Sequence, residues 1–181
     1  SLLHILAKDS QAQVVLLPAD HYVRDEQTLN VALLRALERL DRNADRPVLL
    51  GLQPDEPDTD LGYILPGDVD PLGGHGVARF MEKPGYSVAR EIIDAGGLWN
   101  TFIIVAAART LLDLYMPRYA PLVMEMQVSP AKGQTAASPT GSWPALLSLY
   151  DRLPELDFSR DLLEGRAADL CVLRVPPCGW S

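Results

Sequence analysis

The sequence has 181 residues, of which 48% are hydrophobic and 22% charged, and its formal net charge is −8. This length and composition suit one globular domain with its own core, whereas the acidic balance argues against a nucleic-acid-binding protein, which would present a basic stripe. No apolar stretch approaches the ~20 residues that span a bilayer, and the start lacks the pattern of a signal peptide, so we expect a cytoplasmic protein without a membrane partner.

The first third of the sequence alternates between helical and strand patterns. Residues 2–7 have the pattern of the end of a helix, and the apolar run 13–17 is typical of a strand buried on both faces. Asp25 is placed to cap a helix that ends near Asp41, and residues 47–52 form the next apolar strand. A strand, a long helix and a strand at this spacing predict a βαβ unit with a parallel sheet.

The middle of the sequence changes character. Residues 53–60 form an acidic loop that contains prolines, and residues 62–65 and 77–81 have the pattern of short strands. The turn-rich stretch 67–76 lies between them and ends in Gly73-Gly74-His75-Gly76. Because this glycine cluster does not connect a strand to a helix, we interpret it as a hairpin turn and not as a phosphate-binding loop.

Helix and strand patterns then alternate again. Ser87 is placed to cap a short helix that ends at Ala95, and residues 98–105 form another strand. A helix is expected over residues 107–118, with its end before Pro121.

The last part of the sequence begins with a segment rich in small residues. Residues 129–142 are rich in Ser, Thr, Ala, Gly and Pro and predict a mobile loop. A helix over 144–153, a helical turn over 158–163 and a closing strand over 170–175 follow. Together these elements predict an α/β fold with a mostly parallel sheet and a small antiparallel hairpin region, in one domain over residues 1–181.

Asp20 is the first candidate for chemistry. It lies just past the end of a predicted parallel strand, at the edge of an open α/β sheet where ligands bind, and a carboxylate there is suited to hold Mg²⁺ against phosphate oxygens. The alternative is that Asp20 only starts a turn or caps the next helix. His21 on its own is better explained as a structural residue.

Two further candidates lie at the end of one predicted strand and near the start of another. Glu82 and Lys83 precede a proline at a strand end, where a carboxylate can accept hydrogen bonds from sugar hydroxyls and an ammonium group can contact a phosphate. Asn100 follows Trp99 and carries both donors and acceptors, which suits a sugar diol. A solvated strand end and a turn residue remain the alternative interpretations of these positions.

Cysteine and histidine do not indicate a zinc or redox site. Cys171 and Cys178 lack CxxC spacing, and the three histidines are scattered. We therefore expect both thiols to be reduced.

The order and spacing of these motifs are more specific than any one of them. The motifs, in chain order, are LLPADHYVRDE (16–26), GYI (62–64), FMEKP (80–84), GLWNT (97–101), DFSRDLLE (157–164) and GWS (179–181). This series resembles the sugar-phosphate nucleotidyltransferase family, and most closely its bacterial mannose-1-phosphate guanylyltransferases.

The resemblance implies a role for five residues. Asp20 corresponds to the aspartate that holds the catalytic Mg²⁺, and Gly62 to the glycine that lies against the sugar. Glu82 corresponds to the glutamate that contacts the sugar, Lys83 to the lysine that contacts the sugar phosphate, and Asn100 to the asparagine that contacts sugar hydroxyls.

The resemblance also implies a fold and a reaction. The fold would be Rossmann-like, with a homodimer as a possible arrangement, and the partners would be GTP and mannose 1-phosphate, which give GDP-mannose and pyrophosphate with Mg²⁺. Alternatives are another sugar 1-phosphate with UTP, dTTP or ATP, and a non-catalytic module that binds nucleotide sugars.

Three features depart from the family pattern. The family's opening GGxGTRLxPLS segment is not in this sequence, and the aspartate that follows GWS in the family lies beyond Ser181, so we expect the natural chain to be longer. Phe102 stands where the family has a small residue, which puts the identity of the sugar in doubt.

Overall fold

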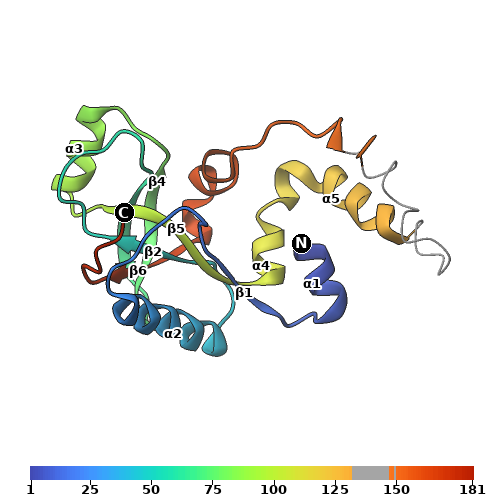
Figure 1. Cartoon of the computed structure of the whole chain (residues 1–181), viewed down its shortest axis with the longest axis horizontal. Coiled ribbons are helices and arrows are strands. Elements are labelled where there is room, and N and C mark those ends of the chain that lie inside the picture. Colours follow the sequence, from blue (N-terminus) through green and yellow to red (C-terminus); the bar gives the residue numbers. More distant parts are fainter. Residues whose placement is uncertain (132–146, 149) are drawn as a thin grey trace.

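A mixed β-sheet forms the centre of the computed structural model, which describes residues 1–131, 147–148 and 150–181 (Figure 1). Its strands are β1 (Gln13–Leu16), β2 (Val48–Leu52), β3 (Tyr63–Val69), β4 (His75–Met81), β5 (Leu98–Ala107) and β6 (Cys171–Val175). Within the described residues their order is β1-β5-β2-β6-β4-β3, and an additional pairing of β3 with β5 closes the sheet into a barrel. β1 lies outside this barrel, beside β5.

The prediction of a mostly parallel sheet is wrong. In the part of the chain that the structure describes, β2 and β6 are the one parallel pair, and every other pairing is antiparallel. β1 and β2 do run in the same direction, as the predicted crossover requires, but β5 lies between them and is antiparallel to both. The order of strands depends on hydrogen bonds between distant segments, which the spacing of strands along the sequence does not reveal.

The two strands of this crossover also differ in burial. All five residues of β2 are buried, as predicted. In β1 the burial alternates, and Val15 is 40% exposed, contrary to the prediction of a strand covered on both faces. The difference follows from position, because β2 has a neighbour on each side, whereas β1 pairs with β5 alone among the described strands.

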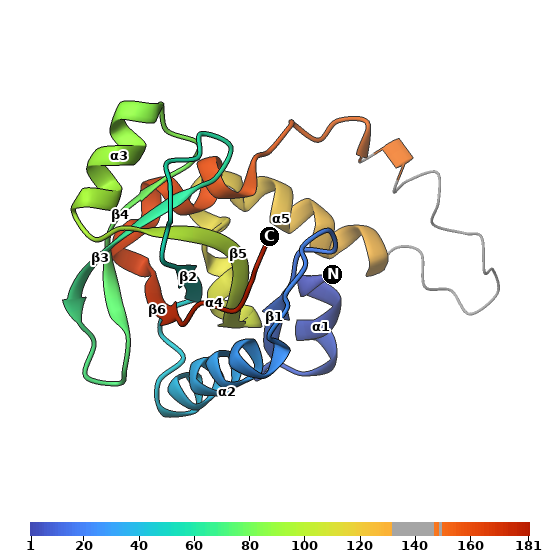
Figure 2. The same ribbon diagram turned by 60° about the vertical axis from the view of Figure 1, so that its left-hand side comes forward.

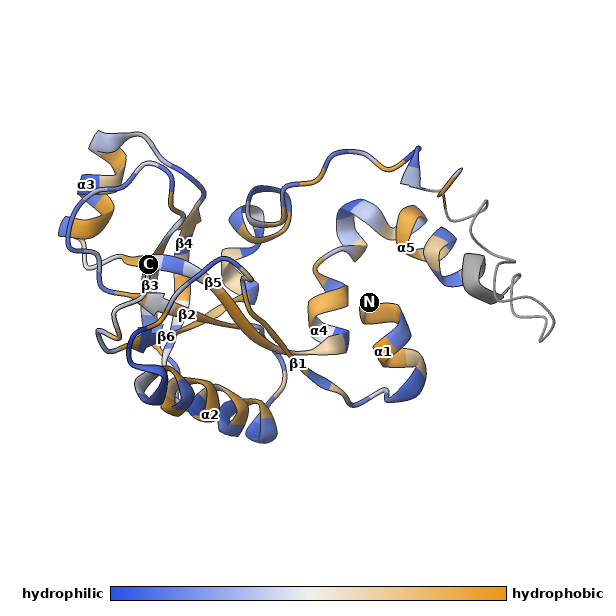
Figure 3. Ribbon diagram, viewed as in Figure 1, coloured by the Kyte–Doolittle hydropathy of each residue, from blue (hydrophilic) through white to orange (hydrophobic). Residues whose placement is uncertain are grey.

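Helices cover the sheet on two sides (Figure 1). They are α1 (Leu2–Lys8), α2 (Glu26–Arg42), α3 (Tyr86–Asp94), α4 (Ala108–Asp113) and α5 (Met116–Ala131), followed by the π-helical η1 (Ser159–Leu163) and the 3₁₀ helix η2 (Glu164–Asp169). One core cluster joins α2 to β2 and β5, and a second joins β3, β4 and β6 to α4, η1 and the opposite face of β5. Figure 3 shows that β2 and β5 are mostly hydrophobic, whereas α2 carries both hydrophobic and hydrophilic residues.

The predicted starts and ends of three helices can be compared with the structure. Asp25 caps α2 as predicted, because its carboxylate accepts a hydrogen bond from the Thr28 backbone N–H at 3.1 Å. The predicted cap of α3 is wrong: the helix begins at Tyr86, and its N-cap is Gly85, not Ser87. The helix expected over 107–118 is divided into α4 and α5, and α5 continues past Pro121 after a kink at Tyr119.

The segment predicted to be a mobile loop, 129–142, lies mostly outside the described residues. Its first three residues are helical and end α5, contrary to the prediction. The helix predicted over 144–153 is described only in part, and residues 147–148 and 150 are helical. The predicted helical turn and closing strand near the end correspond to η1 and β6.

The β3–β4 hairpin confirms the interpretation of the glycine cluster. Its turn is closed by hydrogen bonds between Asp70 and both Gly73 and Gly74, and the two glycines have φ angles of +102° and +86°. Figure 2 shows the hairpin projecting on the side of the molecule away from α1, α4 and α5.

Cys171 and Cys178 are buried free thiols, in agreement with the expected reduced state. Among the helices that the structure describes, none has both the length and the apolar character needed to cross a membrane.

Candidate functional site

Four of the five candidate residues line one pocket of about 340 Å³. We call it the Glu82 pocket; its lining residues are Pro18, Asp20, His21, Asp60, Leu61, Gly62, Glu82, Asn100, Phe102 and Ser159. They come from the segment after β1, the loop before β3, the end of β4, the first half of β5 and the start of η1. The structure therefore brings together residues that lie up to 141 positions apart, from Pro18 to Ser159.

Gly62 allows the loop before β3 to approach the pocket wall. A Cβ atom at this position would lie 2.6 Å from Glu82 Oε2 and 3.4 Å from Asn100 Cβ. The approach is fixed by the Asn100 backbone N–H, which donates to the Gly62 carbonyl oxygen at 2.8 Å. Only glycine fits here without displacing Glu82.

Glu82 has the most unusual environment in the pocket. Its Oε2 atom is buried and has no hydrogen-bond partner among the described residues. Burial raises the pKa of the Glu82 carboxyl, the negative charge of Asp157 raises it further, and Ser159, Lys83 and Arg160 oppose the shift. A half-buried carboxyl whose buried oxygen lacks a partner is typical of a site that contacts a ligand.

Lys83 does not line the pocket. It is exposed, has a φ of +48°, and directly follows Glu82, which does line the pocket. Its positive charge lowers the pKa of the Glu82 carboxyl, so the two groups interact electrostatically.

Asp20 and His21 lie at the mouth of the pocket. The Asp20 side chain is 89% exposed, and its Oδ1 lies 3.9 Å from His21 Nε2. Trp180 Nε1 donates a hydrogen bond to His21 Nδ1 at 3.1 Å, and the two rings meet edge to face at 5.0 Å. His21 Nδ1 is thus an acceptor, which places the proton of the neutral ring on Nε2, the nitrogen that faces Asp20.

The end of the chain supports this segment. The backbones of Tyr22 and Ser181 exchange two hydrogen bonds, of 2.9 and 3.0 Å, and Val23 forms a β-bridge with Trp180. The GWS motif is therefore a brace for the segment that contains Asp20, a role that only the tertiary structure reveals.

A bulge in β5 shapes the remaining wall of the pocket. Leu49 pairs with Ile104 and Gly51 with Asn100, so two steps along β2 correspond to four steps along β5. Inside the bulge, Asn100 Oδ1 accepts from the Phe102 backbone N–H at 3.2 Å. The N–H groups that the bulge removes from the ladder thus find side-chain partners, which fixes its shape.

Thr101 also stabilises the bulge through two hydrogen bonds of its side chain. Its hydroxyl donates to the Leu50 carbonyl oxygen at 2.7 Å and accepts from the Ile103 backbone N–H at 3.2 Å. Asn100 and Thr101 are both buried, so their side chains hold the strand, and Asn100 also lines the Glu82 pocket.

The pocket is chemically suited to Mg²⁺ at its mouth. Mg²⁺ is held in proteins by one or two carboxylates and completes its shell with phosphate oxygens and waters, and Asp20 and Asp60 both line the pocket. Within the described ranges, no group of three or more His, Cys, Asp or Glu side chains forms a complete metal cage. The role of Asp20 as a metal ligand stays a prediction.

Sequence reasoning did not select Asp60 or Ser159. Asp60 ends the acidic loop before GYI, and Ser159 lies in the DFSRDLLE motif, so both adjoin segments that the motifs had marked. Neither residue is close in sequence to Glu82, and only the fold places them at the same pocket.

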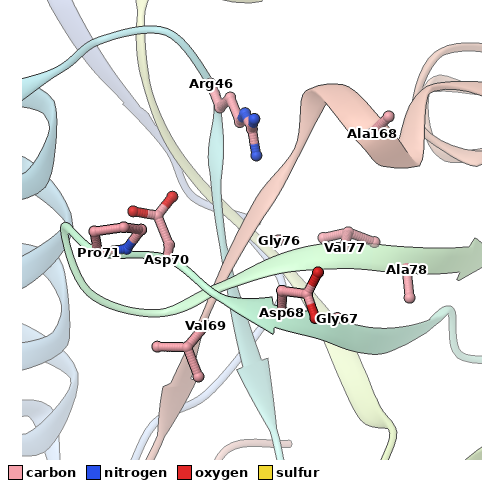
Figure 4. Close-up of a pocket in the computed structure, with 10 residues that line it drawn as sticks. All are labelled: Arg46, Gly67, Asp68, Val69, Asp70, Pro71, Gly76, Val77, Ala78 and Ala168. Atoms are coloured by element: carbon pink, nitrogen blue, oxygen red, sulfur yellow. The ribbon is translucent and has the colours of Figure 1, made fainter.

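A second cavity, of about 470 Å³, lies at the turn end of the β3–β4 hairpin, and we call it the hairpin cavity. Figure 4 shows Arg46 on one side of it and Asp68 and Asp70 on the hairpin. Asp70 accepts a hydrogen bond from Arg39 Nη2 at 2.7 Å, and Arg39 is only 2% exposed. This ion pair fastens α2 to the hairpin.

Known proteins resemble this chain in sequence over between about half and nearly all of its length. The alginate biosynthesis protein AlgA of Pseudomonas syringae pv. tomato is 36% identical over 104 residues, which cover 55% of this chain and 21% of AlgA. The mannose-1-phosphate guanylyltransferase of Escherichia coli K12 is 29% identical over 179 residues, which cover 96% of this chain and 36% of that protein. The chain thus spans between about a fifth and about a third of these two relatives.

Solved structures resemble the chain over almost its whole length. A crystal structure described as a mannose-1-phosphate geranyltransferase from Thermus thermophilus has a TM-score of 0.74 at 28% identity, and the match covers 99% of this chain and 49% of that one. A structure described as a mannose-6-phosphate isomerase from Helicobacter pylori has a TM-score of 0.76 at 21% identity, which indicates a common fold alone. The family described as nucleotidyl transferase matches residues 2–125. The chain therefore belongs to the nucleotidyl transferase family.

Proposed function

We propose that this protein joins mannose 1-phosphate to GTP, forming GDP-mannose and releasing pyrophosphate. The observation that carries the proposal is the convergence of Asp20, Gly62, Glu82 and Asn100, from four separate segments, on the Glu82 pocket. The relatives named for mannose-1-phosphate guanylyl transfer support the choice of sugar and nucleotide.

The sugar would occupy the inner part of the pocket. Glu82 would accept hydrogen bonds from sugar hydroxyls, since its Oε2 has no partner among the described residues. The Asn100 amide would donate to a second hydroxyl, and Gly62 would leave room for the ring beside both side chains. Loss of a bond to a buried polar group is costly, so these contacts would select sugars with hydroxyls at matching positions.

The two phosphate-bearing reactants would meet at the mouth. The ammonium of Lys83 would contact the sugar phosphate, and Asp20, with Asp60 beside it, would hold Mg²⁺. Bound there, Mg²⁺ would neutralise charge on the phosphate oxygens. His21, whose Nδ1 accepts a hydrogen bond from Trp180, would lie beside the metal-binding carboxylate, 3.9 Å from Asp20 Oδ1.

The reaction is an exchange of one P–O bond for another. An oxygen of the sugar 1-phosphate attacks the α-phosphorus of GTP, and the bond from that phosphorus to the bridging oxygen of pyrophosphate breaks. The attacking phosphate oxygen carries no proton that must be removed, so the residues of the pocket act by positioning and by stabilising charge.

Release of pyrophosphate tests the proposal. With the full natural chain, release should require GTP, mannose 1-phosphate and Mg²⁺ together, and should fall when UTP, dTTP or ATP replaces GTP. Asp20→Asn should reduce the rate at least about 100-fold, on the scale of losing one electrostatic contact to the transition state. Asp113→Asn, which changes an exposed aspartate on α4, is the matched control and should leave the rate unchanged.

Three results would contradict parts of this proposal. Mg²⁺-dependent rates close to normal in Asp20→Asn would remove Asp20 from the site. A preference for another nucleotide or sugar phosphate would keep the reaction and change its substrates. Binding of a nucleotide sugar without release of pyrophosphate would identify a non-catalytic binding module.

Lys83 has its own test. Lys83→Ala should raise the KM for the sugar phosphate about tenfold or more, because a charge-assisted contact is lost, and should change the KM for the nucleotide much less. Lys8→Ala, on an exposed position of α1, serves as the control. An equal rise in both KM values would show that Lys83 does not act on the sugar phosphate in particular.

A further inference from the structure

The bulge in β5 directs Phe102 into the Glu82 pocket. Phe102 lines the pocket, whereas its neighbours Thr101 and Ile103 are buried in the core at 1% and 3% exposure. A regular strand would alternate its side chains between the two faces, so the bulge decides which side chain forms this wall.

This placement imposes strain on the backbone. Phe102 has a φ of +57°, in the left-handed region that glycine adopts readily and that a bulky side chain disfavours. The bonds of Asn100 and Thr101 inside the bulge hold the strand in this conformation. Such strain is concentrated at ligand sites, where the surrounding structure fixes a side chain in a required position.

The ring of Phe102 also packs against other aromatic side chains. It meets Phe158 edge to face, with ring centroids 5.4 Å apart, and Phe158 in turn lies 6.3 Å from Tyr115. Phe158 packs against the core cluster that contains Leu111 and Leu163. The aromatic wall is therefore anchored in the core and is unlike a mobile surface side chain.

We propose that Phe102 is a specificity-determining residue that packs against the C–H face of the sugar ring of a hexose 1-phosphate. The inference rests on the proposed function and extends it. Glu82 and Asn100 supply polar contacts to the hydroxyls at the edge of the ring, and Phe102, on the same pocket, supplies an apolar surface. A pyranose has both kinds of surface, so it matches a pocket that combines them.

A purely structural role makes different predictions. If Phe102 only fastens η1 to β5 through Phe158, its replacement changes thermal stability and leaves sugar affinity unaltered. If it contacts the sugar ring, its replacement weakens sugar binding and leaves the nucleotide KM unaltered.

Calorimetric titration with mannose 1-phosphate separates the two roles. In the full natural chain, Phe102→Ala should raise the Kd for mannose 1-phosphate by about three- to tenfold, the range that corresponds to one aromatic contact. Phe102→Leu retains an apolar side chain of comparable volume and should raise the Kd by at least about twofold. The KM for the nucleotide should stay within about twofold of the wild-type value in both variants.

Tyr86→Ala is the matched control, because it removes an aromatic ring that is 62% exposed on α3, outside the pocket lining. Its Kd for mannose 1-phosphate should equal that of the wild type. If Phe102→Ala fails to fold, as a melting curve would show, Phe102→Leu decides the question.

The outcomes distinguish the inference from the function on which it rests. Wild-type binding of mannose 1-phosphate with an unchanged Kd in Phe102→Leu and, where it folds, in Phe102→Ala overturns the role of Phe102 and leaves the proposed reaction intact. A wild-type chain that neither binds nor turns over any hexose 1-phosphate overturns both.

Discussion

The two ends of the β3–β4 hairpin each carry a carboxylate, and the two carboxylates differ in their hydrogen bonds and in the direction of their pKa shifts. At the hairpin cavity, Asp70 accepts from Arg39 at 2.7 Å and from the Leu72 backbone N–H at 2.8 Å. The hydrogen bond from Arg39 is the main cause that lowers the pKa of Asp70. In the Glu82 pocket, burial and the negative charge of Asp157 raise the pKa of the carboxyl, whose Oε2 has no partner among the described residues.

This difference in hydrogen bonding indicates that Asp70 is a structural carboxylate and that Glu82 is a candidate contact to a ligand. Arg39 Nε is itself buried without a partner among the described residues, but the charge of its guanidinium is matched by Asp70 and, at 3.5 Å, by Asp45. Glu82 has the positive charges of Lys83 and Arg160 nearby, but its buried Oε2 has no hydrogen-bond partner among the described residues. A carboxylate that stabilises the fold is paired within the fold, whereas one that binds a ligand remains available.

The largest expected effect is at Asp70. Asp70→Asn should lower the free energy of unfolding by about 3 kcal/mol, because it leaves the buried charge of Arg39 poorly compensated. Urea denaturation near pH 7 measures the change, and pyrophosphate release per folded molecule should stay at the wild-type level.

The control for Asp70 is an exposed ion pair. Asp94→Asn breaks the pair between Arg90 and Asp94, whose side chains are 60% and 66% exposed, and should cost less than about 0.5 kcal/mol. Equal losses in the two variants would remove the distinction between buried and exposed pairs.

A smaller change in stability is expected from substitutions of Phe102, whose backbone is strained. Phe102→Gly and Phe102→Ala both remove the ring, but only glycine relieves the left-handed conformation. The glycine variant should therefore be more stable than the alanine variant by about 1 kcal/mol, measured as the difference in unfolding free energy. An alanine variant at least as stable as the glycine variant would show that the bulge relaxes once the ring is gone.

The smallest expected change in stability is at Glu82. Because Glu82 is partly exposed, Glu82→Gln should raise the free energy of unfolding at pH 7 by less than about 1 kcal/mol, while activity falls. Glu82→Gln should thus raise stability and lower activity, whereas Asp70→Asn should lower stability and leave activity unchanged.

The contributions of Glu82 and Asp70 to stability should change with pH in opposite directions. The folded-state pKa of Glu82 is raised above its ordinary value of 4.5, so its contribution to stability is present below 4.5 and is lost as pH rises through the folded-state pKa. The advantage of Glu82→Gln should then grow from pH 4.5 toward 7. Asp70 behaves in reverse, since its contribution is present above its ordinary value of 3.8 and is lost as pH falls through the lowered pKa.

Local features of the fold could be predicted from the sequence because they depend on neighbouring residues. The Asp25 cap, the buried strand β2 and the hairpin turn at Gly73 are confirmed, and each is determined by a short pattern. The burial of β1 and the continuation of α5 past Pro121 were predicted wrongly, because both depend on what packs against the segment.

The motifs likewise identified most of the candidate site. Asp20, Gly62, Glu82 and Asn100 line the same pocket, whereas Lys83 is not among the lining residues and its role stays a prediction. Phe102 was visible only as a departure from a family pattern, and its position on the pocket wall depends on a register shift between β2 and β5.

The sequence by itself determined the local elements, the capped helix α2, the family motifs and the residue types suited to a sugar phosphate, because these are properties of adjacent residues. The tertiary structure decided the antiparallel pairing of the strands, the hydrogen bond of Trp180 to His21 beside Asp20, and the burial of Glu82 Oε2 without a partner among the described residues. Hydrogen bonds and burial between distant segments produce these features, and no pattern along the chain specifies which distant segments meet.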